Sequence, residues 1–156
     1  MELSITNYTA AHRHDIRRIL ENIGWAEQYI AAAERNTEIF SRDQNKCAYV
    51  AINGDEVIGF IYVQFHEWNR LAQIEGLAVD PGVQRQGAAS KLVARGEEFA
   101  REKGARGMYV DTPTVNQKGR GFYEGIGYKF GYEMPRYYED ELDGVTYQKF
   151  FEKEAR

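Results

Sequence analysis

The chain contains a single cysteine, Cys47, and only three histidines among its 156 residues. A lone cysteine cannot form an intramolecular disulfide, and a cysteine-based zinc cluster needs more than one thiolate. The histidines, His12, His14 and His66, are too few and too scattered along the chain to suggest a metal site. We therefore expect no bound metal.

Long hydrophobic runs and an excess of basic charge are also missing. No apolar run approaches the roughly 20 residues that span a bilayer. The first ten residues, MELSITNYTA, lack the basic and apolar regions of a secretory signal. The net charge is −4, whereas surfaces that bind nucleic acid are basic. These absences predict a cytoplasmic protein with no membrane and no nucleic-acid partner.

The composition that remains is that of a globular protein. Hydrophobic residues make up 43% of the chain, and its 156 residues can bury a substantial core. No linker rich in Pro, Gly or Ser and no internal repeat interrupts it, so we expect one domain over residues 1–156. Eleven tyrosines are unusual, and they suit strand faces and clefts because each has an apolar ring and a polar tip.

Two hydrophobic periods alternate along the chain. Ile16, Ile19 and Leu20 follow helical spacing, and Gly24 is a typical stop signal. Asn53 and Gly54 lie between two β-rich runs and predict a hairpin, because both residues tolerate positive φ. The elements expected are helices over residues 10–23, 25–40, 87–103 and 116–125, and strands over residues 3–8, 47–52, 57–65, 71–79, 107–112, 128–134 and 145–151. This order predicts an α/β (α+β) sandwich with a partly antiparallel and partly parallel sheet.

The junction DPGVQRQGAASKL, residues 80–92, lies between a predicted strand and a long predicted helix. The first N–H groups of a helix lack intrahelical partners, and the helix dipole adds partial positive charge there. Gly87 would let a ligand approach the backbone closely. The junction therefore predicts a phosphate-binding site. Its sequence matches neither of the two common nucleotide-binding motifs, G-x-x-x-x-G-K-[ST] and G-x-G-x-x-G.

Gln84-x-x-Gly87-x-Ala89 resembles the Q/R-x-x-G-x-G/A motif of the GNAT superfamily of N-acetyltransferases. The later segment NQKGRGFYEGIGY, residues 116–128, resembles the N-x6-Y-x3-G[FY] block of the same family. The resemblance extends over residues 3–151 and is tightest over residues 74–128. It implies a GNAT fold, with a mixed sheet of about seven strands, helices on both faces and splayed parallel strands that hold acetyl-CoA.

The resemblance also implies a set of coenzyme-binding residues. The pantetheine arm would pair with the backbone of Leu77, Ala78 and Val79, and the pyrophosphate would lie on the loop and helix N-terminus. The residues implied for the coenzyme as a whole are Leu77, Ala78, Val79, Gln84, Arg85, Gln86, Gly87, Ala88, Ala89, Ser90, Asn116 and Tyr123.

Acetyl transfer to an amine needs a base, an oxyanion donor and a proton for the departing thiolate. In the family a backbone N–H serves as the oxyanion donor, and here this would be the N–H of Leu77. The tyrosine of the last block, here Tyr123, would give its proton to the thiolate. Two carboxylates are candidates for the base. Glu75 lies on the splayed strand, and Asp111 lies in YVDTPTVN, which is similar to a block of the ribosomal-protein N-terminal alanine acetyltransferases.

The acceptor would bind between the first two helices and the last strand pair. Aromatic residues there suit a cationic amine, together with the acidic Glu27, Glu139, Asp140 and Glu141. Either a peptide N-terminus or a small cationic amine fits this pattern, and a solvated acidic turn is a third interpretation of YYEDELDG. A non-catalytic acetyl-CoA-binding or interaction module is the alternative function, and the aromatic C-terminal strand could form a homodimer or complete the sheet. The candidate acceptor residues are Trp25, Tyr29, Tyr137 and Tyr138.

Overall fold

The computed structural model describes residues 3–83 and 87–152. Its strands are β1 (Leu3–Asn7), β2 (Lys46–Asn53), β3 (Glu56–His66), β4 (Leu71–Val79), β5 (Gly107–Pro113), β6 (Lys129–Glu139) and β7 (Leu142–Phe150). Its helices are α1 (Arg13–Ile23), α2 (Glu27–Phe40), α3 (Ala88–Glu102) and α4 (Gln117–Gly125), with short 3-10 turns η1 (Ala10–His12) and η2 (Pro81–Val83).

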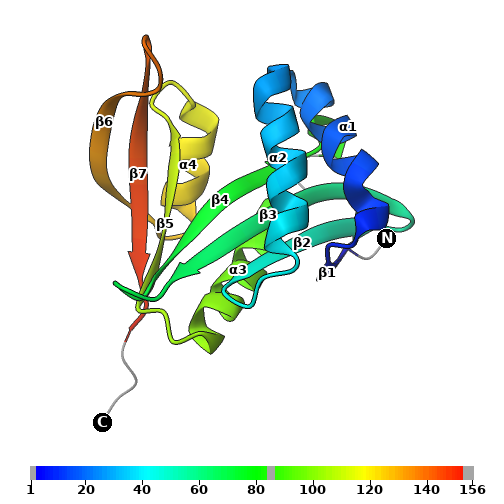
Figure 1. The fold of residues 1–156 in the computed structure, drawn as a ribbon. Helices are drawn as coiled ribbons and strands as arrows, with labels where there is room; N and C mark the ends of the chain where they lie inside the picture. The colour runs from blue at the N-terminus through cyan, green and yellow to red at the C-terminus, as the bar shows by residue number, and fades with distance from the viewer. Residues whose placement is uncertain (1–2, 84–86, 153–156) are drawn as a thin grey trace.

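The strands form one seven-stranded sheet in the order β1-β2-β3-β4-β5-β7-β6. Every neighbouring pair is antiparallel except β4 and β5, which are parallel. Figure 1 shows the sheet opening into two arms. We call β1 to β4 the N-terminal arm, and β5, β7 and β6 the C-terminal arm. The mixed sheet of seven strands confirms the predicted fold class.

Helices cover both faces of the sheet and build two cores. The amphipathic α1 buries Ile16, Ile19 and Leu20 in a cluster that also contains residues of α2 and of the N-terminal arm. On the opposite face, Leu92 of α3 and Tyr123 of α4 belong to the second cluster. In Figure 1, α1 and α2 accordingly lie on one side of the N-terminal arm and α3 on the other. Helices on both faces were predicted from the family resemblance.

The two arms separate because β4 and β5 pair over only part of their length. Their register runs from Leu71 opposite Gly107 to Ile74 opposite Val110, and no later pair forms between the two strands. β4 then continues to Val79 paired with β3 alone. A register shift opposite Tyr62 and Val63 marks a β-bulge in β4 at this point. A bulge bends its strand and increases its twist, which directs β4 away from β5.

Two element boundaries differ from the sequence prediction in a way that matters for the site. β6 extends to Glu139 and β7 begins at Leu142, whereas the prediction ended the first strand at residue 134, began the second at residue 145 and left residues 135–144 between them. The strand resumes after a wide irregularity, in which Met134 pairs with Gly144 and Glu139 pairs with Leu142. Arg136 takes a left-handed φ of 59° there, and its N–H donates to the Asp143 carboxylate at 2.7 Å.

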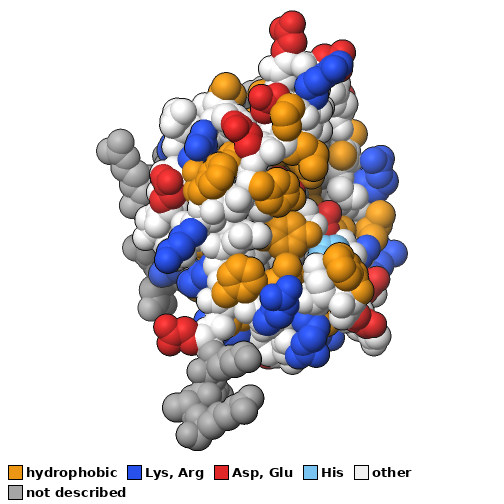
Figure 2. All heavy atoms as spheres, turned by 90° about the vertical axis from the view of Figure 1, so that its left-hand side faces the viewer, with side chains coloured by type: hydrophobic (Ala, Val, Ile, Leu, Met, Phe, Trp, Pro, Cys, Tyr) orange, Lys and Arg blue, Asp and Glu red, His pale blue; other side chains and the backbone are white. Residues whose placement is uncertain are grey.

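The C-terminal strand β7 lies between β5 and β6 and therefore completes the sheet. The edge of the C-terminal arm is β6. Figure 2 shows hydrophobic side chains gathered on the face of the molecule that this arm presents. Phe130, Tyr132 and Met134 of β6 are exposed there. No helix in the described part of the chain is long and apolar enough to cross a membrane.

The α3 face should depend on Leu92, which is fully buried against the sheet. We expect Leu92→Ala to lower the free energy of unfolding by about 2–5 kcal/mol, because it removes buried methyl groups and leaves a cavity. The matched control is Lys91→Ala, one residue earlier on the exposed side of the same helix, which should change stability by less than about 0.5 kcal/mol. Urea titration of both variants checks the difference, and equal losses would contradict the assignment.

Candidate active site

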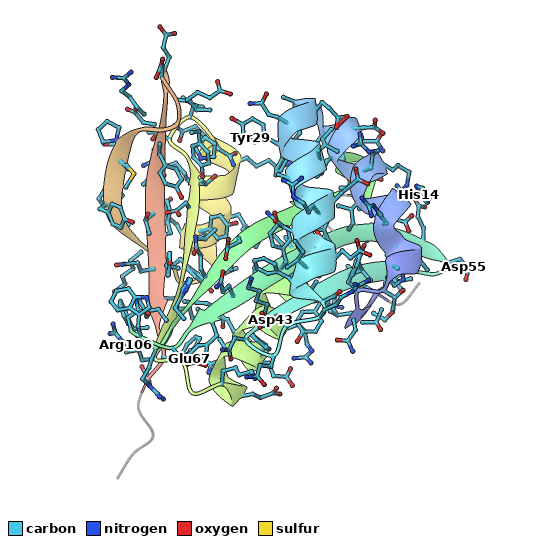
Figure 3. The ribbon with its side chains drawn as sticks, in the orientation of Figure 1. His14, Tyr29, Asp43, Asp55, Glu67 and Arg106 are labelled. Carbon is cyan, nitrogen blue, oxygen red and sulfur yellow. The ribbon has the colours of Figure 1, made fainter. Side chains whose placement is uncertain are left out.

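A cavity of about 960 Å³ lies where β4 and β5 separate. Residues of β4 and β5 line it, together with residues of α2, α4 and the N-terminus of α3. The cavity therefore joins both arms of the sheet to helices on both of its faces. Figure 3 shows Tyr29 projecting from α2 toward the C-terminal arm across this region.

One wall of the cavity is the part of β4 that β5 leaves unpaired. Leu77, Ala78 and Val79 line the cavity, and their ladder partners lie on β3 alone. Successive strand residues direct their N–H and C=O groups to opposite neighbours. Asp80 donates its N–H to Ile58 of β3, so by this alternation the backbone groups of Leu77 and Val79 face the side that β5 leaves open and are available to a ligand. The structure thus brings all three predicted pantetheine residues to the cavity. Their contact with the coenzyme stays a prediction.

The N-terminus of α3 forms a second wall. Gly87 is its N-cap, has a left-handed φ of 78° and, as a glycine, has no side chain that could cap the helix. Gly87, Ala88, Ala89 and Ser90 all line the cavity. Uncapped first-turn N–H groups and the helix dipole together favour an anion at this end. The predicted residues Gln84, Arg85 and Gln86 lie outside the described residues.

Asn116 also lines the cavity, but its side chain is engaged within the protein. Its Oδ1 accepts the N–H of Gly119 at 3.0 Å and so caps α4, and its Nδ2 donates to the Thr112 hydroxyl at 3.0 Å. A Cβ at Gly119 would lie 2.3 Å from Nδ2, which explains why glycine occupies this helix position. Asn116 therefore fixes the start of α4 and the end of β5 relative to each other.

Tyr123 projects from α4 into the second core and reaches the cavity with its remaining exposed surface of 7%. Its ring packs at 6.0 Å from that of Tyr128 and at 6.4 Å from that of Tyr147. Burial raises the pKa of the Tyr123 phenol well above its ordinary value. The hydroxyl is therefore protonated at neutral pH and can serve as a proton donor.

Asp111 on β5 lines the cavity and is surrounded by donors. The Thr146 hydroxyl donates a short hydrogen bond to Oδ1. The Tyr137 phenol donates to Oδ2 at 3.1 Å, and the Gln73 amide lies 3.5 Å from the same oxygen. These three donors occupy most of the lone-pair sites of the carboxylate. This arrangement suits a carboxylate that holds neighbouring groups in place.

Glu75 lies at the bulge of β4 and lines the same cavity. Its side chain keeps contact with solvent, yet burial by the surrounding protein raises the pKa of its carboxyl above the ordinary value of 4.5, and Asp111 adds to the shift. His66 and Lys46 partly oppose it. A carboxylate with a raised pKa is a better proton acceptor near neutral pH. The two candidate bases thus share one cavity but differ in environment.

The four predicted acceptor residues come from two parts of the chain. Trp25 lies just before α2 and Tyr29 within it, whereas Tyr137 and Tyr138 lie on β6. Trp25, Tyr29 and Tyr138 line the cavity, whereas Tyr137 contacts Asp111 and is absent from the lining. Neighbouring strand residues normally point to opposite faces, but in this irregular part of β6 the rings of Tyr137 and Tyr138 lie 4.8 Å apart. Gly144 leaves room for the Tyr137 ring, because a Cβ there would lie 2.8 Å from it.

Most of the acidic residues expected near the acceptor already have partners. Arg17 donates to Glu27 at 2.7 and 2.8 Å, which lowers the pKa of that carboxyl, and Arg136 pairs with Asp140 at 2.9 Å. The Tyr29 hydroxyl donates to Glu139 at 2.7 Å, so α2 and the β6–β7 hairpin touch above the cavity. The charged residues of the described cavity lining are Glu75, Asp111 and Lys118.

Tyr62 and Gly76 also belong to the site, although neither was predicted from the sequence. Tyr62 of β3 packs directly over Gly76 of β4, where a Cβ would lie 2.0 Å from its ring, and both residues line the cavity. A glycine inside a strand pattern signals a bulge or a close approach. Gly76 carried that signal within LAQIEGLAV. Among the described residues, no group of three or more His, Cys, Asp or Glu is arranged to hold a metal.

Comparisons with known proteins agree with this geometry. The sequence model of the acetyltransferase (GNAT) family matches residues 12–128. Streptothricin acetyltransferase of Streptomyces lavendulae is 30% identical over 89 residues, which cover 56% of this chain and 47% of that protein. N-alpha-acetyltransferase 30 of Schizosaccharomyces pombe is 24% identical over 148 residues, which cover 93% of this chain and 96% of that protein.

The same fold occurs among solved structures. Ard1 from Thermoplasma volcanium superposes with a TM-score of 0.82 at 20% identity, covering 98% of this chain and 100% of that chain. The chain thus spans about half the length of streptothricin acetyltransferase and nearly all of N-alpha-acetyltransferase 30.

Proposed function

Because the chain belongs to the acetyltransferase (GNAT) family, we propose that it transfers an acetyl group from acetyl-CoA to the primary amine of a cationic acceptor. The observation that carries this proposal is the cavity between β4 and β5. It connects the uncapped N-terminus of α3, which favours an anion, with a region where Glu75 and Asp111 favour a cation. Coenzyme and amine would meet between them.

In this proposal Glu75 is the base. It accepts a proton from the acceptor ammonium, directly or through a water, so that the amine nitrogen can attack the thioester carbonyl. The raised pKa of Glu75 and the three donors around Asp111 favour this assignment over Asp111. Asp111 instead orients Tyr137 and Thr146 along the acceptor side of the cavity.

Two further groups complete the transfer. The backbone N–H of Leu77, on the unpaired part of β4, would donate to the oxyanion as the nitrogen–carbon bond forms. When the carbon–sulfur bond breaks, Tyr123 would donate its phenolic proton to the departing thiolate. The new amide nitrogen would then lose its extra proton to the Tyr123 phenolate, which restores the phenol. A tyrosine phenol is neutral at physiological pH and carries the proton that this role needs, and Tyr123 lines the cavity.

The acceptor class has two candidates within the same reaction. A small cationic amine is favoured by the two carboxylates of the cavity lining and by the similarity to streptothricin acetyltransferase. A peptide N-terminus is the second candidate, which the similarity to N-alpha-acetyltransferase 30 over nearly the whole chain favours. Tyr137 and Tyr138 fit either acceptor, since their rings and hydroxyls can contact both cations and peptide groups.

Release of free CoA from acetyl-CoA, followed with a thiol reagent, tests the proposed function. The amine panel contains aminoglycosides, polyamines, streptothricin, lysine peptides and peptides with different N-terminal residues. A protein-only blank removes any signal from Cys47. Turnover with small cationic amines is the expected result. Tight binding of acetyl-CoA without turnover for any amine would instead favour a non-catalytic acetyl-CoA-binding module.

We expect Tyr123→Phe to lower kcat by about 10²-fold with little change in acetyl-CoA affinity, because it removes a general acid but keeps the ring. Tyr128→Phe is the matched control, since Tyr128 is equally buried but donates to Glu97 at 2.8 Å and does not line the cavity. Steady-state kinetics and coenzyme titration separate the two effects. An unchanged kcat in Tyr123→Phe would remove the assignment.

The base assignment predicts different pH–rate profiles for two isosteric variants. The base must be deprotonated to act, so the raised pKa of Glu75 moves the acidic limb of kcat/KM above pH 4.5 in the wild type. Glu75→Gln should lose this limb and most of the activity, whereas Asp111→Asn should keep the limb and alter mainly the KM of the amine. Retention of the limb in Glu75→Gln would exclude Glu75 as the base.

A further inference from the structure

Asp80, at the end of β4, is a buried carboxylate with an exposed fraction of 8%. Its Oδ1 accepts the backbone N–H of Gly82 at 3.0 Å, and its carbonyl accepts the N–H of Val83 at 3.1 Å. Its own N–H donates to the carbonyl of Ile58 at 2.7 Å. These bonds define the turn of residues 80–83, through which the chain leaves β4 toward the N-terminus of α3.

The second carboxylate oxygen of Asp80 binds Arg18 of α1. The guanidinium lies 3.0 Å from Oδ2 of Asp80, and the two residues are 62 positions apart in the sequence. Arg18 also donates to the carbonyl of Val57 at 2.7 Å and to Asp15 at 3.1 Å, with Glu56 at 3.6 Å. One side chain thus joins α1, the start of β3 and the turn after β4.

We propose that Arg18 and Asp80 are a positioning pair that sets the affinity for the pyrophosphate-bearing coenzyme. The inference rests on the proposed function, since it assigns the N-terminus of α3 to the pyrophosphate. Neither residue lines the cavity. They act by holding the turn of residues 80–83, which ends four residues before the N-cap Gly87.

Arg18 has a second effect through charge. Asp80 carries a negative charge close in sequence to an anion-binding helix terminus, and Arg18 compensates it at 3.0 Å. A buried carboxylate that loses its partner is strongly unfavourable and would repel an approaching pyrophosphate. Removal of Arg18 therefore disturbs both the position of the turn and the local charge.

The test compares two acetyl donors, acetyl-CoA and S-acetylpantetheine, which lacks the pyrophosphate. For Arg18→Met we expect kcat/KM with acetyl-CoA to fall roughly tenfold, the equivalent of one lost hydrogen bond to a charged group, mainly through KM. With S-acetylpantetheine kcat/KM should stay within about twofold of the wild type. A loss of equal size on both donors, or on neither, would overturn the proposal.

Arg13→Met is the matched control. Arg13 lies on the same helix and pairs with Glu34 at 3.4 Å and Glu38 at 3.2 Å, away from the turn. It should lower stability without discriminating between the donors. Asp80→Ala separates the effect of the turn's position from the effect of the Asp80 charge. A positioning role predicts weaker acetyl-CoA binding in this variant. Tighter binding, which charge repulsion alone predicts, would overturn the proposal.

Two outcomes need a second variant or measurement. If Arg18→Met does not fold, Arg18→Lys keeps the charge but loses the forked geometry, and it should show the same donor-selective loss at smaller size. If the wild type turns over neither donor, the proposed function fails. Dissociation constants of CoA and pantetheine from calorimetry then test the pair alone, and Arg18→Met must weaken CoA only.

Discussion

Backbone hydrogen bonds join β4 to β5 over only four residue pairs, from Leu71 opposite Gly107 to Ile74 opposite Val110. Beyond these pairs the strands leave each other, and the free edge of β4 becomes the wall of a cavity. Unpaired backbone groups inside a sheet are costly unless something else satisfies them. A ligand with its own amide groups would satisfy them, and in our proposal the interrupted ladder is therefore the coenzyme-binding surface. The other features of the site are arranged around this gap.

The arms need independent support, since the sheet no longer joins them along its full length. One core packs α1 and α2 on the N-terminal arm, and the other joins α3 and α4 to both arms. At the end of the sheet where β4 and β5 remain paired, Glu97 of α3 accepts the hydroxyl proton of Tyr128 at 2.8 Å and pairs with Lys149 of β7 at 3.2 Å. This buried carboxylate ties α3 to the C-terminal arm below the cavity. At the other end of the cavity, an exposed hydrogen bond from Tyr29 to Glu139 joins α2 to β6 of the C-terminal arm.

The sequence predicted the elements whose signals are local. Helical spacing located α1, Asn53 and Gly54 located the hairpin, and the family motifs located the α3 N-terminus and Tyr123 at the cavity. Features that depend on distant partners were missed. The extension of β6 needs Arg136 in a left-handed conformation with Asp143 as its acceptor, while Pro135 and the acidic run read locally as a turn. Similarly, nothing near Asp111 in sequence indicated that Thr146 and Tyr137 would donate to it. Local pattern indicated where most of the strands lie, but it did not indicate which side chains of neighbouring strands contact each other.

Backbone amide spectra recorded during titration with acetyl-CoA, in the absence of amine, provide the most direct test of binding in the gap between β4 and β5. We expect the amide resonances of Leu77, Ala78, Val79 and residues 88–90 to shift in a saturable manner, because these groups line the cavity. Resonances of β1, at the far edge of the sheet, should stay unchanged. Saturable shifts located elsewhere, with the β4 and α3 amides unaffected, would contradict the proposal that the separation of β4 and β5 creates the coenzyme site.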